Sequence, residues 1–96
     1  MKIIETALQV LNDEIDGINL LKKFFDSNFE EAVNIIFKSK GKVIVTGVGK
    51  SGHIGRKISA TLSSTGTPSF FIHPTEASHG DMGMIEKNDV IFAISW

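Results

Sequence analysis

The first quarter of the chain repeats apolar residues at helical spacing. Alternating steps of four and three put five of them on one stripe: Ile4, Leu8, Leu11, Ile15 and Ile18. Residues 3–25 are therefore predicted to form a helix, whose pattern Gly17 interrupts. A stripe this apolar needs a covering partner, either in its own domain or in another subunit.

A second helix is predicted within the segment DSNFEEAVNIIFKSKG, residues 26–41. Ser27 is expected to cap its start, with Glu30 completing a capping box. Lys38 near the end suits the negative end of the helix dipole, and Gly41 ends the helix. Its predicted buried face consists of Phe29, Ala32, Val33, Ile36 and Phe37.

From residue 42 the spacing of apolar residues changes. Strands are predicted at 42–47, 69–74 and 88–95, a helix at 52–64, and a short helix or loop at 76–82. The helix presents Ile54, Ile58 and Leu62 on one face. The unbroken apolar run Val90–Ile94 is typical of a strand covered on both faces, but here we expect one face and the outer edge of this strand to be uncovered. Strands alternating with helices indicate an α/β fold with a parallel sheet. We therefore expect a helical region at 1–40 and an α/β domain at 41–96.

Composition narrows the classes of function. The 96 residues include 10 basic and 11 acidic side chains, a net charge of −1. This balance argues against a broad nucleic-acid or anionic-membrane surface, but it is compatible with a small basic pocket for an anionic metabolite. The sequence contains no cysteine, which excludes disulfides and cysteine-ligated zinc. The longest apolar run, Val90 to Ile94, is too short to span a membrane, and the first residues lack the core of a signal peptide. We expect a cytoplasmic protein.

A glycine-rich turn, GVGKSG at residues 47–52, follows the first predicted strand. Such a turn before a helix exposes backbone N–H groups that bind phosphate; alternatively, the glycines only make a tight turn. A dinucleotide site would need an acidic residue near His73, and a P-loop would need glycine in place of Ile44. Lys50 is either a ligand for a phosphate or an oxyanion, or a solvated surface charge. For Arg56 and Lys57 a solvated helix face is favoured.

Two histidines follow the second predicted strand. His73 ends that strand and His79 comes six residues later, with Glu76 and Asp81 nearby. Histidines beside carboxylates are a zinc-binding combination, but this spacing matches no standard metal motif. Each histidine has two simpler roles open to it, capping a strand end or hydrogen-bonding a sugar hydroxyl.

Three longer motifs together resemble one known family. GKSGHIGRK, STGTP and HPTEASHGDMGMI closely resemble the sugar isomerase (SIS) domain of arabinose 5-phosphate isomerases, from about residue 41 to 95. The resemblance implies a doubly wound, flavodoxin-like parallel sheet, of which residues 41–96 would carry an incomplete part. It also implies an aldose–ketose isomerase that interconverts D-ribulose 5-phosphate and D-arabinose 5-phosphate to supply the Kdo sugar of lipopolysaccharide. A homo-oligomer is expected for the complete enzyme.

The same resemblance implies roles for single residues. Lys50 matches a lysine important for catalysis, and Gly66, Thr67 and His79 match substrate-contacting positions. His73 matches a position that holds zinc, but the family's reaction needs no metal, so zinc there would be non-essential. Isomerisation moves a proton between neighbouring carbons through an enediolate. Lys50 and His79 suit the stabilisation of its charge, and neither matches the base.

The family pattern continues after the third strand into a phosphate-binding loop, S-N-S-G-E-[ST], whose glutamate is important for catalysis. Here Trp96 follows Ser95, and neither Glu76 nor Glu86 matches that glutamate. We therefore expect the chain to be inactive alone and poorly stable as a monomer. The alternative function is a non-catalytic SIS module that binds a phosphosugar or a partner subunit.

Overall fold

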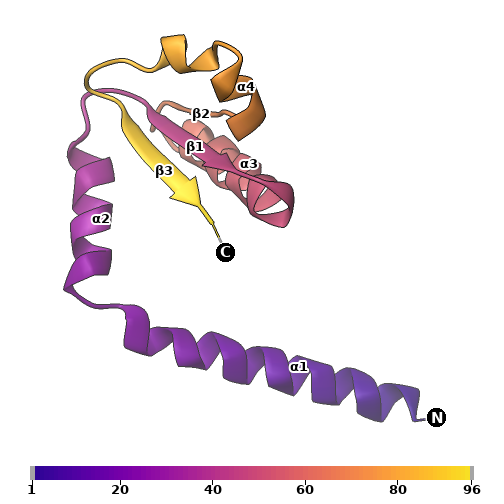
Figure 1. The fold of residues 1–96 in the computed structure, drawn as a ribbon. Helices are drawn as coiled ribbons and strands as arrows, with labels where there is room; N and C mark the ends of the chain where they lie inside the picture. Colours follow the sequence, from indigo (N-terminus) through magenta and orange to yellow (C-terminus); the bar gives the residue numbers. More distant parts are fainter. Residues whose placement is uncertain (1, 96) are drawn as a thin grey trace. The chain divides into compact units, whose positions relative to one another are not determined.

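The computed structural model describes residues 2–95 and divides the chain into two compact units. The first unit ends at Asn34 and is helical, and the second begins at Ile35 and contains the sheet (Figure 1). Among the described residues, no helix is both long enough and apolar enough to cross a membrane.

The predicted N-terminal helix is confirmed over nearly its whole length. α1 (Ile3–Leu20) continues into the short 3-10 helix η1 (Leu21–Phe24), and Gly17 does not break it. The apolar stripe of α1 is exposed, with Leu8 and Leu11 each at 56%. The stripe therefore remains available for a contact.

α2 (Ser27–Lys38) confirms the second predicted helix, but its cap and its face differ from the prediction. Asp26 is the cap: its Oδ1 accepts hydrogen bonds from the backbone N–H groups of Asn28 at 3.0 Å and Phe29 at 3.2 Å. The prediction of Ser27 is wrong because a cap must precede the first helical residue, which Ser27 already is. The expected buried face is not buried either, and Phe37 is 83% exposed.

Three parallel strands form the sheet of the second unit, as predicted. β1 (Val43–Gly47) lies between β2 (Ser69–Phe71) and β3 (Val90–Ile94). Val45 of β1 lies opposite Phe71 of β2 and Phe92 of β3. β1 contains the core, since Val43, Ile44 and Val45 are at most 2% exposed. The glycine-rich turn after β1 therefore lies in the middle of the sheet's carboxyl edge.

α3 (Gly49–Ser64) connects β1 to β2 and covers one face of the sheet (Figure 1). Its buried residues are small: Gly52, Gly55 and Ser59. Ile54, on the expected apolar face, is instead 56% exposed. A methyl group on Gly55 would lie 3.0 Å from Cε2 of Phe71 and 3.1 Å from Cγ1 of Val45. Glycine thus lets the helix backbone approach the sheet closely.

β3 is covered on one face only, within the part of the chain that the structure describes. Phe92 is half-buried and lies opposite Val45, on the face that α3 covers. Ile91 points to the other face and is 50% exposed. The expectation that one apolar face of this strand is left uncovered is therefore confirmed for these residues, because α3 packs on the Val45 side alone.

α4 (Pro74–Ser78) and the 3-10 helix η2 (Asp81–Met84) lead from β2 towards β3.

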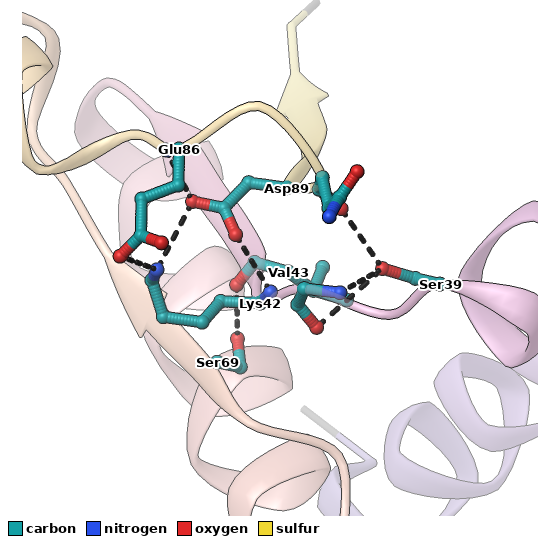
Figure 2. A network of polar contacts seen from close by, with 8 residues as sticks. Ser39, Lys42, Val43, Ser69, Glu86 and Asp89 are labelled. Atoms are coloured by element: carbon teal, nitrogen blue, oxygen red, sulfur yellow. Dashed lines mark hydrogen bonds and ion pairs between the residues drawn. The ribbon is translucent and has the colours of Figure 1, made fainter.

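A polar network links the starts of β1 and β3 at the amino edge of the sheet. Figure 2 shows Asp89, just before β3, hydrogen-bonded to Lys42, just before β1, with Ser39 and Glu86 close by. This network aligns the starts of the two strands, so their carboxyl ends finish side by side.

Candidate functional site

A pocket of about 410 Å³ opens at the carboxyl edge of the sheet. Its lining comes from the ends of β1 and β3 and the starts of α3 and α4: Thr46, Gly47, Val48, Ser51, Pro74, Ala93, Ile94 and Ser95. The polar side chains in this lining are the hydroxyls of Thr46, Ser51 and Ser95. Ligands of parallel α/β folds bind at this edge. The pocket therefore lies where the glycine-rich turn predicted a binding site.

The start of α3 contributes backbone donors to the pocket. α3 begins at Gly49, so most of the predicted glycine-rich turn is helical. Val48 is the cap residue and its side chain makes no hydrogen bond, which leaves the first N–H groups of the helix without a side-chain acceptor. Val48 and Ser51 both line the pocket. These N–H groups, at the positive end of the helix dipole, suit an anion such as phosphate.

Lys50 lies in the first turn of α3 rather than in a loop. The helix begins at Gly49, earlier than the predicted start at residue 52. A methyl group on Gly52 would lie 2.8 Å from the carbonyl oxygen of Gly47, so glycine permits the close approach of this first turn to the end of β1. Lys50 is exposed and is not among the lining residues, although Val48 and Ser51 on either side are. The catalytic role of Lys50 stays a prediction.

The two candidate histidines stand at opposite ends of α4. His73 is the cap residue at the start, where its Nδ1 accepts a hydrogen bond from the backbone N–H of Thr75 at 3.2 Å. His79 follows the last helical residue and is exposed. Pro74, next to His73, lines the pocket. The sequence left open that His73 caps a strand end. In the structure His73 is a cap, but at the start of a helix.

Gly66 and Thr67 lie at the other end of α3 from Lys50. The N–H of Gly66 bonds to the carbonyl of Ser63 at 3.4 Å, and the N–H of Thr67 bonds to the carbonyl of Leu62 at 2.8 Å. With a φ of +101° at Gly66, these bonds form a Schellman motif that ends the helix. A helix of 16 residues is about 24 Å long. The structure therefore does not bring Gly66 and Thr67 into the pocket beside Lys50, and their contact with a substrate stays a prediction.

The surroundings of His73 do not form a metal site. Within residues 2–95, no group of three or more histidine, cysteine, aspartate or glutamate side chains is placed to hold a metal ion. The Nδ1 nitrogen of His73 is already engaged by Thr75. The described residues therefore do not fit the zinc that the family resemblance implies for this position.

Several lining residues were not singled out from the sequence. Thr46 is the last residue but one of β1, and Ser95 directly follows β3. Ser51 lies in the first turn of α3, and Pro74 begins α4. Their positions at the carboxyl ends of predicted parallel strands were the available signal, because those ends meet at one edge. The hydroxyl residues had less apparent chemistry than Lys50 and the histidines, and so they were missed.

Comparison with known proteins agrees with this architecture. The model of the SIS domain family matches residues 35–96. The chain belongs to the SIS domain family. The resemblance carried by the three motifs is thereby confirmed, and so is the parallel α/β fold that it implied.

Curated relatives of this SIS chain are similar over almost all of its residues. It is 55% identical over 95 residues to the arabinose 5-phosphate isomerase KdsD of Francisella tularensis subsp. tularensis, covering 96% of this chain and 29% of the relative. It is 50% identical over 95 residues to KdsD of Pseudomonas aeruginosa, covering 99% and 29%. The chain thus spans less than a third of the length of these relatives.

Solved structures share the fold. A protein of E. coli CFT073, in complex with arabinose 5-phosphate, has a TM-score of 0.87 at 43% identity, covering 97% of this chain and 50% of that one. A protein of Bacteroides fragilis NCTC 9343 has a TM-score of 0.85 at 36% identity, with the same coverage. The three-stranded sheet therefore corresponds to an incomplete SIS sheet.

Proposed function

We propose that this protein acts as an aldose–ketose isomerase that interconverts D-ribulose 5-phosphate and D-arabinose 5-phosphate. The observation that carries the proposal is the 50–55% identity to arabinose 5-phosphate isomerases over nearly the whole chain. The arabinose 5-phosphate bound to the E. coli CFT073 relative supports a phosphorylated pentose as the ligand. In this role the protein would serve Kdo and lipopolysaccharide synthesis.

The pocket offers groups that suit part of this chemistry. The uncapped N–H groups at the start of α3 and the hydroxyls of Thr46, Ser51 and Ser95 are donors for phosphate or sugar oxygens. Lys50 beside the pocket is a cation for the charge that develops on the enediolate. The matching family positions predict substrate contacts for His79, Gly66 and Thr67. Because Gly66 and Thr67 lie at the far end of α3, a contact by them would be made outside this pocket.

The base is the missing part of the site. Isomerisation requires a group that removes a proton from the carbon next to the carbonyl. Among the described residues that line the pocket, none has a titratable side chain. The proposed function therefore needs a base from outside this lining, and Glu76 and Glu86 match no family base.

The lack of a base in the described lining also favours a second candidate, a non-catalytic SIS module that binds a phosphosugar or a partner subunit. One experiment separates the two candidates. The protein is incubated with ribulose 5-phosphate while arabinose 5-phosphate formation is followed by NMR, and binding of the same sugar is titrated in parallel. Turnover supports the isomerase. Binding without turnover supports the non-catalytic module. If the protein neither converts nor binds the sugar, both candidate functions are rejected for phosphosugars.

Three further features belong to the proposal. We infer that the reaction needs no metal, so that a chelator leaves turnover unchanged; restoration of a lost activity by zinc would contradict this. The protein is proposed to be cytoplasmic and to form a homo-oligomer. The exposed apolar stripe of α1 is the feature that supports self-association.

A further inference from the structure

A second pocket, of about 360 Å³, lies at the amino edge of the sheet, opposite the edge that holds the candidate site. We call it the amino-edge pocket. Its lining comes from the residues just before the three strands: Lys40, Gly41, Lys42, Pro68, Glu86, Lys87, Asn88 and Asp89. Three of these side chains are lysines and two are carboxylates, whereas the described lining of the candidate site has no charged side chain. The two pockets therefore suit different ligands.

The charges that line the amino-edge pocket are not all paired. The Nζ of Lys42 lies 3.2 Å from Oε1 of Glu86 and 3.1 Å from Oδ2 of Asp89, so one lysine engages both carboxylates. Lys40 and Lys87 are exposed, and neither forms an ion pair within the part of the chain that the structure describes. Three lysines against two carboxylates leave the lining with a net charge of +1 and with two unpaired ammonium groups.

Backbone contacts bring Lys40 and Lys87 to the same pocket. Ser39, the residue before Lys40, donates a hydrogen bond through its Oγ to the carbonyl of Asn88, the residue after Lys87, at 3.4 Å (Figure 2). A methyl group on Gly41, the residue after Lys40, would overlap the same carbonyl, so glycine permits this close approach. The two lysines are distant in sequence, and they lie together because their neighbours are in contact.

We propose that the amino-edge pocket binds a small multivalent oxyanion of the phosphate class between Lys40 and Lys87. Two ammonium groups at one pocket repel each other, and an anion between them replaces that repulsion with two attractions. Lysine binds phosphate as a point charge, whereas the planar fork that suits a carboxylate belongs to arginine, which is not among the described lining residues. A volume of about 360 Å³ also falls within the range of small-molecule pockets.

The site is tested first in the unaltered protein. Sodium phosphate is titrated into isotope-labelled protein, with sodium chloride keeping the ionic strength constant, and the backbone amide signals are followed by NMR. We expect saturable shifts at Gly41, Lys87 and Asn88. Phosphate bound at the start of α3 is detected separately, by the amides of Val48 and Ser51. Shifts at Val48 and Ser51 alone, or no saturable shift at any of these amides, would overturn the proposal.

Variants of the lining predict the sign of the change in phosphate affinity, read from the amide of Gly41. Lys87→Gln removes an unpaired ammonium group and should weaken binding roughly two- to fivefold, the effect of one exposed ion pair. Glu86→Gln removes a carboxylate from the lining and one of the two partners of Lys42, so it should tighten binding by a similar factor. Lys57→Gln is the matched control, because it removes an equal charge from the exposed face of α3, outside this pocket.

Equal affinities of Lys87→Gln and Lys57→Gln, or weaker binding to Glu86→Gln than to the parent, would refute the proposal. The altered side chains are all exposed, so these variants should fold like the parent. Inorganic phosphate and glycerol 3-phosphate then distinguish the source of the anion: tighter binding of the first identifies free phosphate, and tighter binding of the second identifies a phosphate ester. No readout uses isomerase activity, so the result is independent of the proposed function.

Discussion

The side chain of Asp89 contacts both the backbone and the side chain of Lys42. The Oδ1 of Asp89 accepts the backbone N–H of Lys42 at 2.8 Å, and the Oδ2 lies 3.1 Å from the Lys42 Nζ. Lys42 directly precedes β1 and Asp89 directly precedes β3, and pairing of the strands begins with Val43 opposite Val90. Figure 2 shows the Asp89 carboxylate between the starts of the two strands, where it supports their register. The far ends of the same strands line the pocket.

Asp89→Asn is expected to destabilise the second unit. The Asp89 side chain is 1% exposed, and its second oxygen also accepts the Glu86 N–H at 2.7 Å. An amide would lose one acceptor and turn an NH₂ group towards the backbone N–H of Lys42 or Glu86, which would lose its hydrogen bond. The urea midpoint should fall clearly. Glu86→Gln is the control, since that side chain is 77% exposed and its ion pair with Lys42 contributes little. Similar midpoints for the two variants would contradict the role of Asp89.

The same carboxylate makes stability depend on pH in the acid range. The backbone N–H groups of Glu86 and Lys42 lower the pKa of Asp89 below its ordinary value of 3.8. The unfolded chain then binds this proton at a higher pH than the folded protein. The contribution of Asp89 is therefore complete above about pH 4 and is lost as the pH falls through the folded pKa. Between about pH 4 and 2, the urea midpoint of the parent should fall more steeply than that of Asp89→Asn. Parallel slopes would count against this explanation.

Two glycine-to-alanine changes should act in opposite directions. A methyl group on Gly52 would lie 2.8 Å from the carbonyl oxygen of Gly47, so Gly52→Ala must move α3 off the end of β1. Such overpacking costs about 1–3 kcal/mol of unfolding free energy. Gly17 in α1 has no atom within 4 Å of the added methyl, so Gly17→Ala should increase helix stability by about 0.5–1 kcal/mol. Thermal unfolding followed by circular dichroism measures both. A stable Gly52→Ala variant would show that α3 does not need this close approach.

The sequence was sufficient to predict those features that depend on neighbouring residues in the chain. The β-branched run Val43–Val45 predicted a buried central strand, and the alternation of strands and helices predicted the parallel sheet, as observed. The position of the site followed as well, because the glycine-rich turn ends the central strand. These features depend on residue order and spacing alone.

The remaining features depend on contacts between distant residues or on competition between neighbours. Asp26 and Ser27 are both good caps, and only the helix start decides between them. The burial of Gly55 depends on Phe71, which is distant in sequence. Gly66 belongs to a motif near Lys50 in sequence, but the length of α3 separates them. Spacing along the chain therefore located the site without showing which residues share its pocket.

The α1 stripe should mediate self-association. Leu8 is 56% exposed on that stripe, and a glutamate there would place a charge in any apolar contact that the stripe makes. Leu8→Glu should lower the mass measured by light scattering towards that of a single chain. Thr6→Glu adds the same charge on the opposite side of the helix and should leave the mass unchanged. Equal masses for the parent and Leu8→Glu would exclude this stripe as the contact surface.

Lys50 should matter for turnover and not for folding. It lies in the first turn of α3 between two pocket-lining residues, Val48 and Ser51, and its own side chain is exposed. If its ammonium group stabilises the enediolate, Lys50→Ala in a complete enzyme that carries this segment should lower kcat for ribulose 5-phosphate at least about tenfold, the factor that corresponds to about 1.4 kcal/mol of lost transition-state stabilisation. Lys57→Ala, which removes an exposed lysine further along the same helix, is the matched control and should retain parental kcat. Both variants should keep the parental urea midpoint, because neither side chain is buried. Near-parental turnover of Lys50→Ala would assign Lys50 to the solvated surface instead.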